Sequence, residues 1–299
     1  MSLVAVGCGK GSPGSTFVSI NLAASLSSLG QHVLLMDVDP HGGDLTAYLG
    51  LDPRRGLHPL TRMHGANGSE ALLKEADPRG ERVLCLGGFP RSGDVDLEVI
   101  PVILKSAVAT GRTVVADLGR VNFESAGVFS SADLILIAVR PDLIGVYGAQ
   151  RAIDDLQQAG IPPAKIAAVI TGWEHQRPAD LAESAKALKA RAVGAIPLDR
   201  RHARKALVAQ QPLHQGPAVK AFYSLASEVS RIMDSPIVKR GCCPPSNTTT
   251  FNPCRASTEA KVEPPIPEPI IATSYFMNVA SEWNILQLRH VPRSGSYKA

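Results

Sequence analysis

A glycine-rich turn near the N-terminus contains the residues best suited to bind phosphate. The turn covers residues 9–16 and reads Gly-Lys-Gly-Ser-Pro-Gly-Ser-Thr. In the standard phosphate-binding loop, G-x-x-x-x-G-K-[ST], backbone amides surround the β-phosphate, the lysine bridges the β- and γ-phosphates, and the hydroxyl residue ligates magnesium. Gly9, Gly14 and Thr16 fit this pattern, whereas Ser15 stands in the place of the lysine. The turn is therefore predicted to bind phosphate without its usual cation.

The residues on either side of this turn predict a strand before it and a helix after it. Residues 3–6 form a short apolar run, as expected of a buried parallel strand. After Gly14, the side chains of Phe17, Ile20 and Ala24 recur at helical spacing. The turn would then lie at the N-terminus of a helix, where amide groups and the helix dipole favour an anion. The alternative is a glycine turn that serves only the backbone.

Strand and helix patterns continue to alternate along the chain. Further apolar runs of strand length lie at 31–36, 83–86, 113–116, 134–139, 166–170 and 193–196. Helical patterns lie at about 95–110, 143–159, 178–190 and 220–233. Strands separated by helices predict right-handed crossovers and an α/β fold, a mostly parallel sheet with helices on both faces. We expect one domain over residues 1–235, with ligands at the carboxyl ends of its strands.

Carboxylates follow two of these predicted strands. Asp117 comes directly after the run at 113–116, where a phosphate-binding fold carries the acid that holds magnesium. Asp37 and Asp39 close the second strand and precede a polar turn at 41–44. The alternative interpretation is that these acids cap the next element.

The glycine-rich turn resembles the deviant Walker A loop of the ParA/MinD ATPases, K-G-G-x-G-K-[ST]. The positions that match are Lys10, Gly11, Gly14 and Thr16. Three positions depart from the pattern, since Ser12 replaces a glycine, Ser15 the second lysine and Phe17 a frequent threonine. In this family the early lysine reaches across a dimer to phosphates bound by the other subunit. The resemblance makes Lys10 the candidate replacement cation.

The resemblance extends over about residues 1–235. The segment Asp-Val-Asp-Pro at 37–40 is similar to the switch I segment D-x-D-P-Q-G of ParA. That match implies that Asp39 helps to position the attacking water and that Asp37 supports the metal site. The segment Asp-Leu-Gly-Arg at 117–120 stands where ParA has D-x-P-P.

Two later segments resemble the family's base-binding residues, so the implied cofactors are ATP and Mg²⁺. Thr171 ends a strand similar to one that contacts the base, and residues 194–199 resemble the G-x-I-P-x-D/N turn beside adenine. The implied nucleotide-binding residues are Gly11, Ser12, Pro13, Gly14, Ser15, Thr16, Phe17, Thr171, Pro197 and Asp199. The implied metal-binding residues are Thr16, Asp37 and Asp117. A missing electrostatic contact of this kind costs about 10²–10³ in rate, so we expect ATP binding with slow or absent hydrolysis.

Two functions of different classes remain open. The first is a ParA/MinD-like dimerisation switch that hydrolyses ATP slowly and positions DNA or another cargo, with Lys10 and Asp39 as its catalytic residues. The second is a noncatalytic nucleotide-binding scaffold, similar to TadZ/CpaE proteins, for pilus or secretion machinery. Asp39 and Asp117 favour the first and Ser15 favours the second. A small-molecule kinase is a weaker third interpretation, because phosphoryl transfer within a monomer needs a cation that this loop lacks.

The charge of the chain is nearly balanced, which limits the class of partner. The net charge is +4, and residues 1–235 carry 24 Lys and Arg against 23 Asp and Glu. One basic cluster on a predicted short helix is a candidate for nonspecific DNA binding or a merely solvated face: Arg200, Arg201, Arg204 and Lys205. No run of about twenty apolar residues and no signal-peptide pattern occurs, so a cytoplasmic location is expected.

Residues 236–299 differ in composition from the rest. Proline-rich stretches without periodicity predict a disordered tail. A short helix at 275–289 is possible, because Phe276, Val279, Trp283 and Leu286 recur at three- and four-residue spacing. That stripe would dock on the core, bind a partner or remain disordered. Five cysteines without a C-x-x-C pair make a disulfide framework unsupported, and the three in the tail leave a metal site as a remote alternative.

Overall fold

The computed structural model describes residues 2–10, 14–40, 43–57, 68–88, 97–174, 178–188 and 190–235. The chain divides into two units, Met1–Gly241 and Cys242–Ala299, and the described residues lie in the first. The predicted domain boundary, the tail and its possible helix therefore lie outside the described residues.

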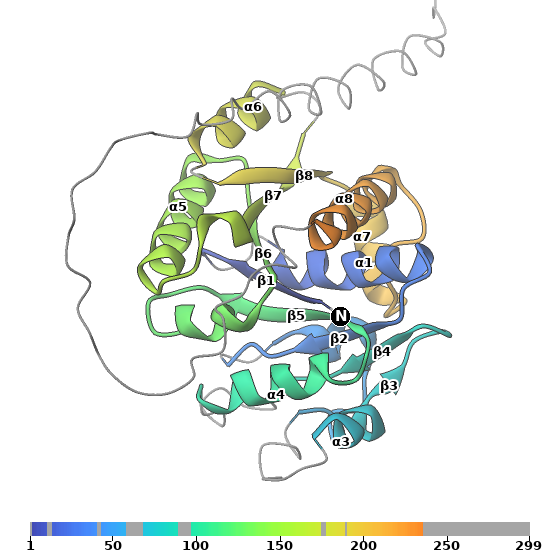
Figure 1. Ribbon diagram of the computed structural model, residues 1–299. Helices are drawn as coiled ribbons and strands as arrows, with labels where there is room; N and C mark the ends of the chain where they lie inside the picture. The colour runs from blue at the N-terminus through green and yellow to red at the C-terminus, as the bar shows by residue number, and fades with distance from the viewer. Residues whose placement is uncertain are drawn as a thin grey trace, which may run out of the picture. The chain divides into compact units, whose positions relative to one another are not determined.

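An eight-stranded sheet forms the centre of this unit (Figure 1). Its strand order is β3-β4-β2-β5-β1-β6-β7-β8, and only β3 at one edge is antiparallel to its neighbour. The strands are β1 (Leu3–Cys8), β2 (Val33–Asp37), β3 (Asp77–Pro78), β4 (Val83–Leu86), β5 (Thr113–Arg120), β6 (Leu134–Val139), β7 (Ile166–Trp173) and β8 (Arg191–Pro197). The prediction of a mostly parallel sheet is confirmed.

Helices cover both faces of the sheet. They are α1 (Ser15–Ser28), α2 (Leu45–Leu49), α3 (Gly68–Glu75), α4 (Val99–Val108), α5 (Leu143–Gln158), α6 (Pro178–Ala187), α7 (Arg200–Val208) and α8 (Pro217–Asp234), with 3₁₀ turns η2 (Ala126–Ser131) and η3 (Pro163–Lys165). α1 and α8 pack side by side on one face, and α4 and α5 lie on the other (Figure 1).

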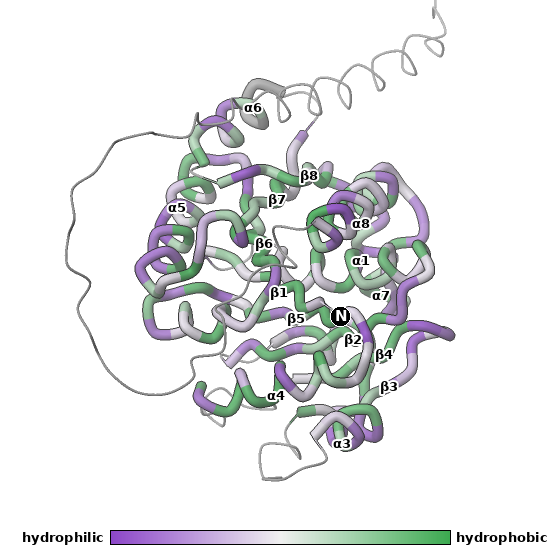
Figure 2. The backbone as a smooth tube through the Cα atoms, in the orientation of Figure 1, coloured by the Kyte–Doolittle hydropathy of each residue, from purple (hydrophilic) through white to green (hydrophobic). Residues whose placement is uncertain are grey.

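The two faces bury separate apolar clusters because successive side chains of each strand point to opposite sides. In β1, Val4 and Val6 join the cluster beneath α1 and α8, whereas Leu3 and Ala5 join the cluster beneath α4 and α5. Figure 2 shows the corresponding concentration of hydrophobic colour along the central strands. β1 is fully buried.

Several element bounds differ from the sequence predictions. The strand predicted at 113–116 continues to Arg120, because its pairing with β1 resumes after a register shift and extends to Cys8. Asp117 therefore lies within a strand rather than after one. The edge strand β3 and the short helices α2 and α3 have no counterpart in the apolar pattern, since each buries few side chains.

Candidate functional site

The described end of the glycine-rich turn leads directly into α1. Gly14 precedes the helix with φ 90° and ψ 32°, a left-handed conformation that glycine adopts without strain. Among the described residues, no side chain caps this end of α1, so the first amides of the helix are available there for an anion. Gly11, Ser12 and Pro13 lie outside the described residues. The predicted strand and helix on either side of the turn are both present.

Ser15 and Thr16 at the start of α1 lie beside Asp117 of β5. Ser15 is buried, and the hydroxyls of both residues are close enough to lower the pKa of the Asp117 carboxyl. The Ser15 hydroxyl also contacts the thiol of Cys8, whose pKa is raised to about 11, chiefly by burial. The position that carries a lysine in the standard loop therefore holds a small side chain facing a buried acid.

Asp117 is almost completely buried. Burial is the main cause that raises its pKa to about 7, and the charge of Asp39 adds to the rise. The amide of Gly119 donates to its Oδ1 atom at 3.4 Å, while its Oδ2 atom has no hydrogen-bond partner among the described residues. An unpaired buried carboxylate oxygen is costly. A cation near Oδ2 would remove that cost.

Asp37 lies opposite Asp117 on the neighbouring strand and is fully buried. Burial, followed by the charge of Asp117, raises its pKa well above the ordinary range. Its carboxylate accepts hydrogen bonds from the amides of Leu45 at 3.0 Å and Asp39 at 3.3 Å. Asp37 thus also anchors the start of α2, in line with the alternative interpretation that this acid caps the next element.

Two glycines, Gly43 and Gly119, make room for the carboxylates of Asp37 and Asp39 because they have no Cβ atom. A Cβ atom at Gly43 would overlap the carboxylate of Asp37, and a Cβ atom at Gly119 would overlap that of Asp39. Gly119 also has φ +63°, a conformation that other residues rarely adopt. The three predicted acids are therefore brought together, and close backbone packing holds them there.

The side chains around Asp117 could bind magnesium only together with water and a bound phosphate. Among the described residues, no group of three or more His, Cys, Asp or Glu side chains is arranged to hold a metal ion by itself. Mg²⁺ usually binds through one or two carboxylates, together with water and substrate phosphates. Thr16, Asp117 and, behind them, Asp37 would supply the protein's part of such a site. Magnesium bound there would neutralise phosphate charge.

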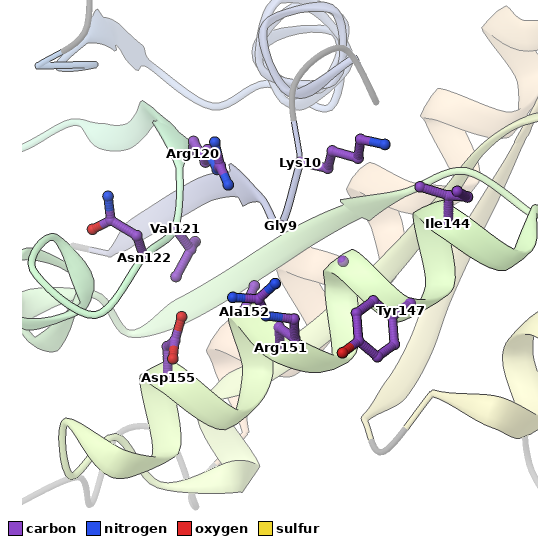
Figure 3. Close-up of a pocket in the computed structure, with 11 residues that line it drawn as sticks. Gly9, Lys10, Arg120, Val121, Asn122, Ile144, Tyr147, Arg151, Ala152 and Asp155 are labelled. Atoms are coloured by element: carbon purple, nitrogen blue, oxygen red, sulfur yellow. The ribbon is translucent and has the colours of Figure 1, made fainter.

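Lys10 comes two residues after β1 and is exposed. The preceding Gly9 packs so closely on α5 that a Cβ atom there would overlap the carbonyl oxygen of Gly148. A pocket of about 250 Å³ opens beside Lys10, between the end of β5 and α5 (Figure 3). Arg120 and Arg151 line it together with Lys10.

The predicted base-binding residues lie at the same end of the sheet, on β7 and after β8. Thr171 is buried, and its hydroxyl donates to the carbonyl of Val139 at 3.3 Å. Pro197 is buried at the end of β8, and Asp199 caps α7 by accepting from the amide of His202 at 3.2 Å. A base contact by these residues remains a prediction.

The side chain of Phe17 has a structural role. Its ring makes an edge-to-face contact with Phe222 of α8, with the ring centroids 5.6 Å apart. A contact of Phe17 with nucleotide would then involve its backbone amide, at the beginning of α1. The four residues of the predicted basic cluster are all exposed on α7.

Sequence reasoning did not identify Gly43, Arg120 and Arg151 as parts of the site. Arg120 belongs to the segment 117–120, where it departs from the family pattern, and that departure was the available signal. Nothing in the local sequence marks Arg151, because it lies in an ordinary amphipathic helix. Gly43 has importance only through its contact with Asp37.

No protein-family model matches the chain. An uncharacterised ATP-binding protein of Methanocaldococcus jannaschii is 25% identical over 237 residues, which cover 76% of this chain and 86% of that protein. The chromosome-partitioning ATPase Soj of Thermus thermophilus is 46% identical over 85 residues, which cover 26% of this chain and 34% of Soj.

Solved structures share the whole fold. The MinD protein in the MinC:MinD complex of Aquifex aeolicus superposes with a TM-score of 0.66 at 20% identity, covering 77% of this chain and 96% of that one. The chain has the fold of the ParA/MinD P-loop ATPases. MinD of Pyrococcus horikoshii, solved with Mg-ADP, gives a TM-score of 0.62 at 17% identity, over 80% of this chain and 99% of that one. None of the helices in the described ranges is long and apolar enough to cross a membrane.

Proposed function

We propose that this ParA/MinD-like chain binds ATP with Mg²⁺ between the glycine-rich turn and Asp117. The observation that carries the proposal is the buried, unpaired Oδ2 atom of Asp117 beside Thr16, at the uncapped N-terminus of α1. A helix N-terminus attracts phosphate, and a buried carboxylate lacking a partner attracts a cation. A protein with this fold that was solved with Mg-ADP supports the choice of an adenine nucleotide with magnesium as the ligand.

Bound nucleotide would act as a switch for dimerisation. The side chains of Leu143, Ile144 and Tyr147 at the start of α5 are 86%, 56% and 61% exposed, next to the pocket that contains Lys10. Exposed apolar side chains of this kind are typical of protein interfaces. The family resemblance supplies the rest of the proposal, in which Lys10 reaches the nucleotide of a second copy.

The protein's own residues would perform two tasks in slow hydrolysis. Asp39 would position the attacking water, while Thr16 and Asp117 would hold the metal that neutralises phosphate charge. Ser15 supplies no charge, so turnover is expected to be slow. By their printed names, one relative is a chromosome-partitioning ATPase and one solved structure is a cell division protein complex. We infer a role in positioning a cargo, with α7 as the candidate surface for DNA and a cytoplasmic location.

The noncatalytic scaffold is the second candidate function. The specific observation in its favour is the buried Ser15, which faces Asp117 where an active loop carries its lysine. A scaffold of this kind would bind ATP and dimerise without turnover.

Calorimetry with a nonhydrolysable ATP analogue tests the first step. Binding should require Mg²⁺, and Thr16→Ala should weaken the magnesium-dependent part about tenfold, in line with the loss of one ligand. Ser28→Ala is the matched control, because the Ser28 hydroxyl lies at the other end of α1 and bonds only within the helix. Absence of binding heat with the wild-type protein would refute the proposed nucleotide site.

A further inference from the structure

The pocket beside Lys10 gathers positive charge from three separate elements. Lys10 comes from the turn after β1, Arg120 from the end of β5, and Arg151 from the middle of α5. Figure 3 shows Lys10 and Arg120 on either side of Gly9, with Arg151 extending from α5 below them. Asp155 is the only carboxylate among the described lining residues. The pocket is therefore strongly cationic.

The pocket shares its wall with the predicted phosphate-binding turn. Arg120 pairs in the sheet with Cys8, two residues before Lys10, and lies three residues after Asp117. Gly9 and Gly148 bring the turn and α5 into direct backbone contact at the same place. The pocket therefore lies directly beside the predicted phosphate-binding turn.

The three cations make no ion pair with any carboxylate in the described part of the chain. Other arginines do form such pairs, as Arg231 does with Glu228 at 2.7 Å. Arg140 likewise pairs with Asp142 at 3.2 Å. Guanidinium groups that are not held in ion pairs bind phosphate oxygens strongly, because each can donate two parallel hydrogen bonds.

We propose that Arg120 and Arg151, together with Lys10, bind the terminal phosphate of ATP and supply the positive charge that Ser15 does not. The inference rests on the proposed function, because it requires ATP at the glycine-rich turn. Under this proposal, Arg120 and Arg151 are the residues that make the protein bind a nucleoside triphosphate more tightly than a diphosphate. The phosphate belongs either to the chain's own nucleotide or to that of a second copy.

The test compares affinities for a nonhydrolysable Mg-ATP analogue and for Mg-ADP by calorimetry. Wild-type protein should prefer the triphosphate. Arg120→Gln and Arg151→Gln should each reduce that preference about tenfold, since each removes a charge-assisted contact, and should change ADP affinity less than about twofold. Arg120→Lys should restore part of the preference, because it keeps the charge but loses the paired donors. Thermal denaturation of each variant confirms that it is folded.

Arg112→Gln is the matched control, since Arg112 precedes the other end of β5 and donates to the carbonyl of Arg82 at 3.3 Å. Wild-type protein that binds neither nucleotide would overturn the proposed function and this inference together. Protein that binds both nucleotides equally, or whose preference survives both glutamine variants, would overturn this inference alone. If the preference for the triphosphate appears only at concentrations where dimers form, the phosphate belongs to the nucleotide of the second copy. If the preference is present at all concentrations, the phosphate belongs to the chain's own nucleotide. Both results support the role of the arginines.

Discussion

At the scale of single residues, the most unusual feature is a pair of buried acids on neighbouring strands. Burial raises the pKa of Asp117 to about 7 and that of Asp37 in the same direction. Between about pH 4 and 7, the nucleotide-free native state therefore keeps a proton that the unfolded chain releases. Stability must fall as pH rises through this range and then level off.

Asp117→Asn should remove the part of this pH dependence that comes from Asp117, whereas the burial of Asp37 leaves the part that comes from that acid. Because one pKa unit corresponds to about 1.4 kcal/mol, the wild type loses at most on the order of 4 kcal/mol from this group. The variant should consequently melt higher than the wild type at pH 8 without nucleotide, yet gain no stability from Mg-ATP. Thermal melts from pH 5 to 8 measure both effects. Asp52→Asn is a suitable control, because Asp52 pairs with Arg54 and its lowered pKa lies outside this range. Parallel wild-type and Asp117→Asn profiles would contradict the predicted titration.

A substitution at Ser15 would distinguish the slow ATPase from the noncatalytic scaffold. Ser15→Lys would place an ammonium beside Asp117 and the bound phosphates, where it has acids to balance its charge. We expect ATP turnover to rise by one to two orders of magnitude, and Asp39→Ala to cancel the gain. A phosphate-release assay measures the rate. An unchanged rate despite retained ATP binding would favour the noncatalytic scaffold.

At the scale of elements, the contact between the turn and α5 has a direct test. Gly9→Ala would place a methyl group on the carbonyl oxygen of Gly148, so either α5 or the turn must move. We expect a loss of about 1–3 kcal/mol in stability from overpacking and weaker nucleotide binding. Gly127→Ala is the control, because a Cβ atom there meets nothing within 4 Å. Urea denaturation of both variants decides the point, and equal stabilities would show that the contact is not tight.

The elements also show how far the sequence was informative. β4 and β6 have the predicted bounds, and α5 matches to one residue, because buried strands and amphipathic helices leave regular patterns. The position of Asp117 within β5 was not predictable, since strand length there depends on pairing with Cys8 across the sheet. The same applies to the site. Thr16, Asp37 and Asp117 follow from motif spacing, whereas Arg151 reaches the pocket only through the packing of α5.

At the scale of the whole molecule, the proposed dimer predicts a change in mass with ATP. Light scattering should show a monomer without nucleotide and a dimer with saturating Mg-ATP analogue. Lys10→Ala should prevent that change while leaving monomeric nucleotide binding largely intact, if the charge of Lys10 acts on the phosphates of the second copy. Lys165→Ala is a useful control, since Lys165 is on η3 and bonds the carbonyl of Ala132. A wild-type protein that stays monomeric at saturating nucleotide would contradict the dimer.

The contact between Gly9 and Gly148 also has an evolutionary consequence. A Cβ atom at Gly9 would overlap the backbone of Gly148, and a backbone atom cannot become smaller to make room for it, so Gly9 has no tolerated substitute while α5 stays in place. A Cβ atom at Gly148 would meet the Lys10 side chain at 3.2 Å and nothing closer, so that position is less restricted. Distant descendants that lose hydrolysis but keep this packing should thus still keep Gly9, and its retention beside altered acids would distinguish a repurposed switch from a decayed one.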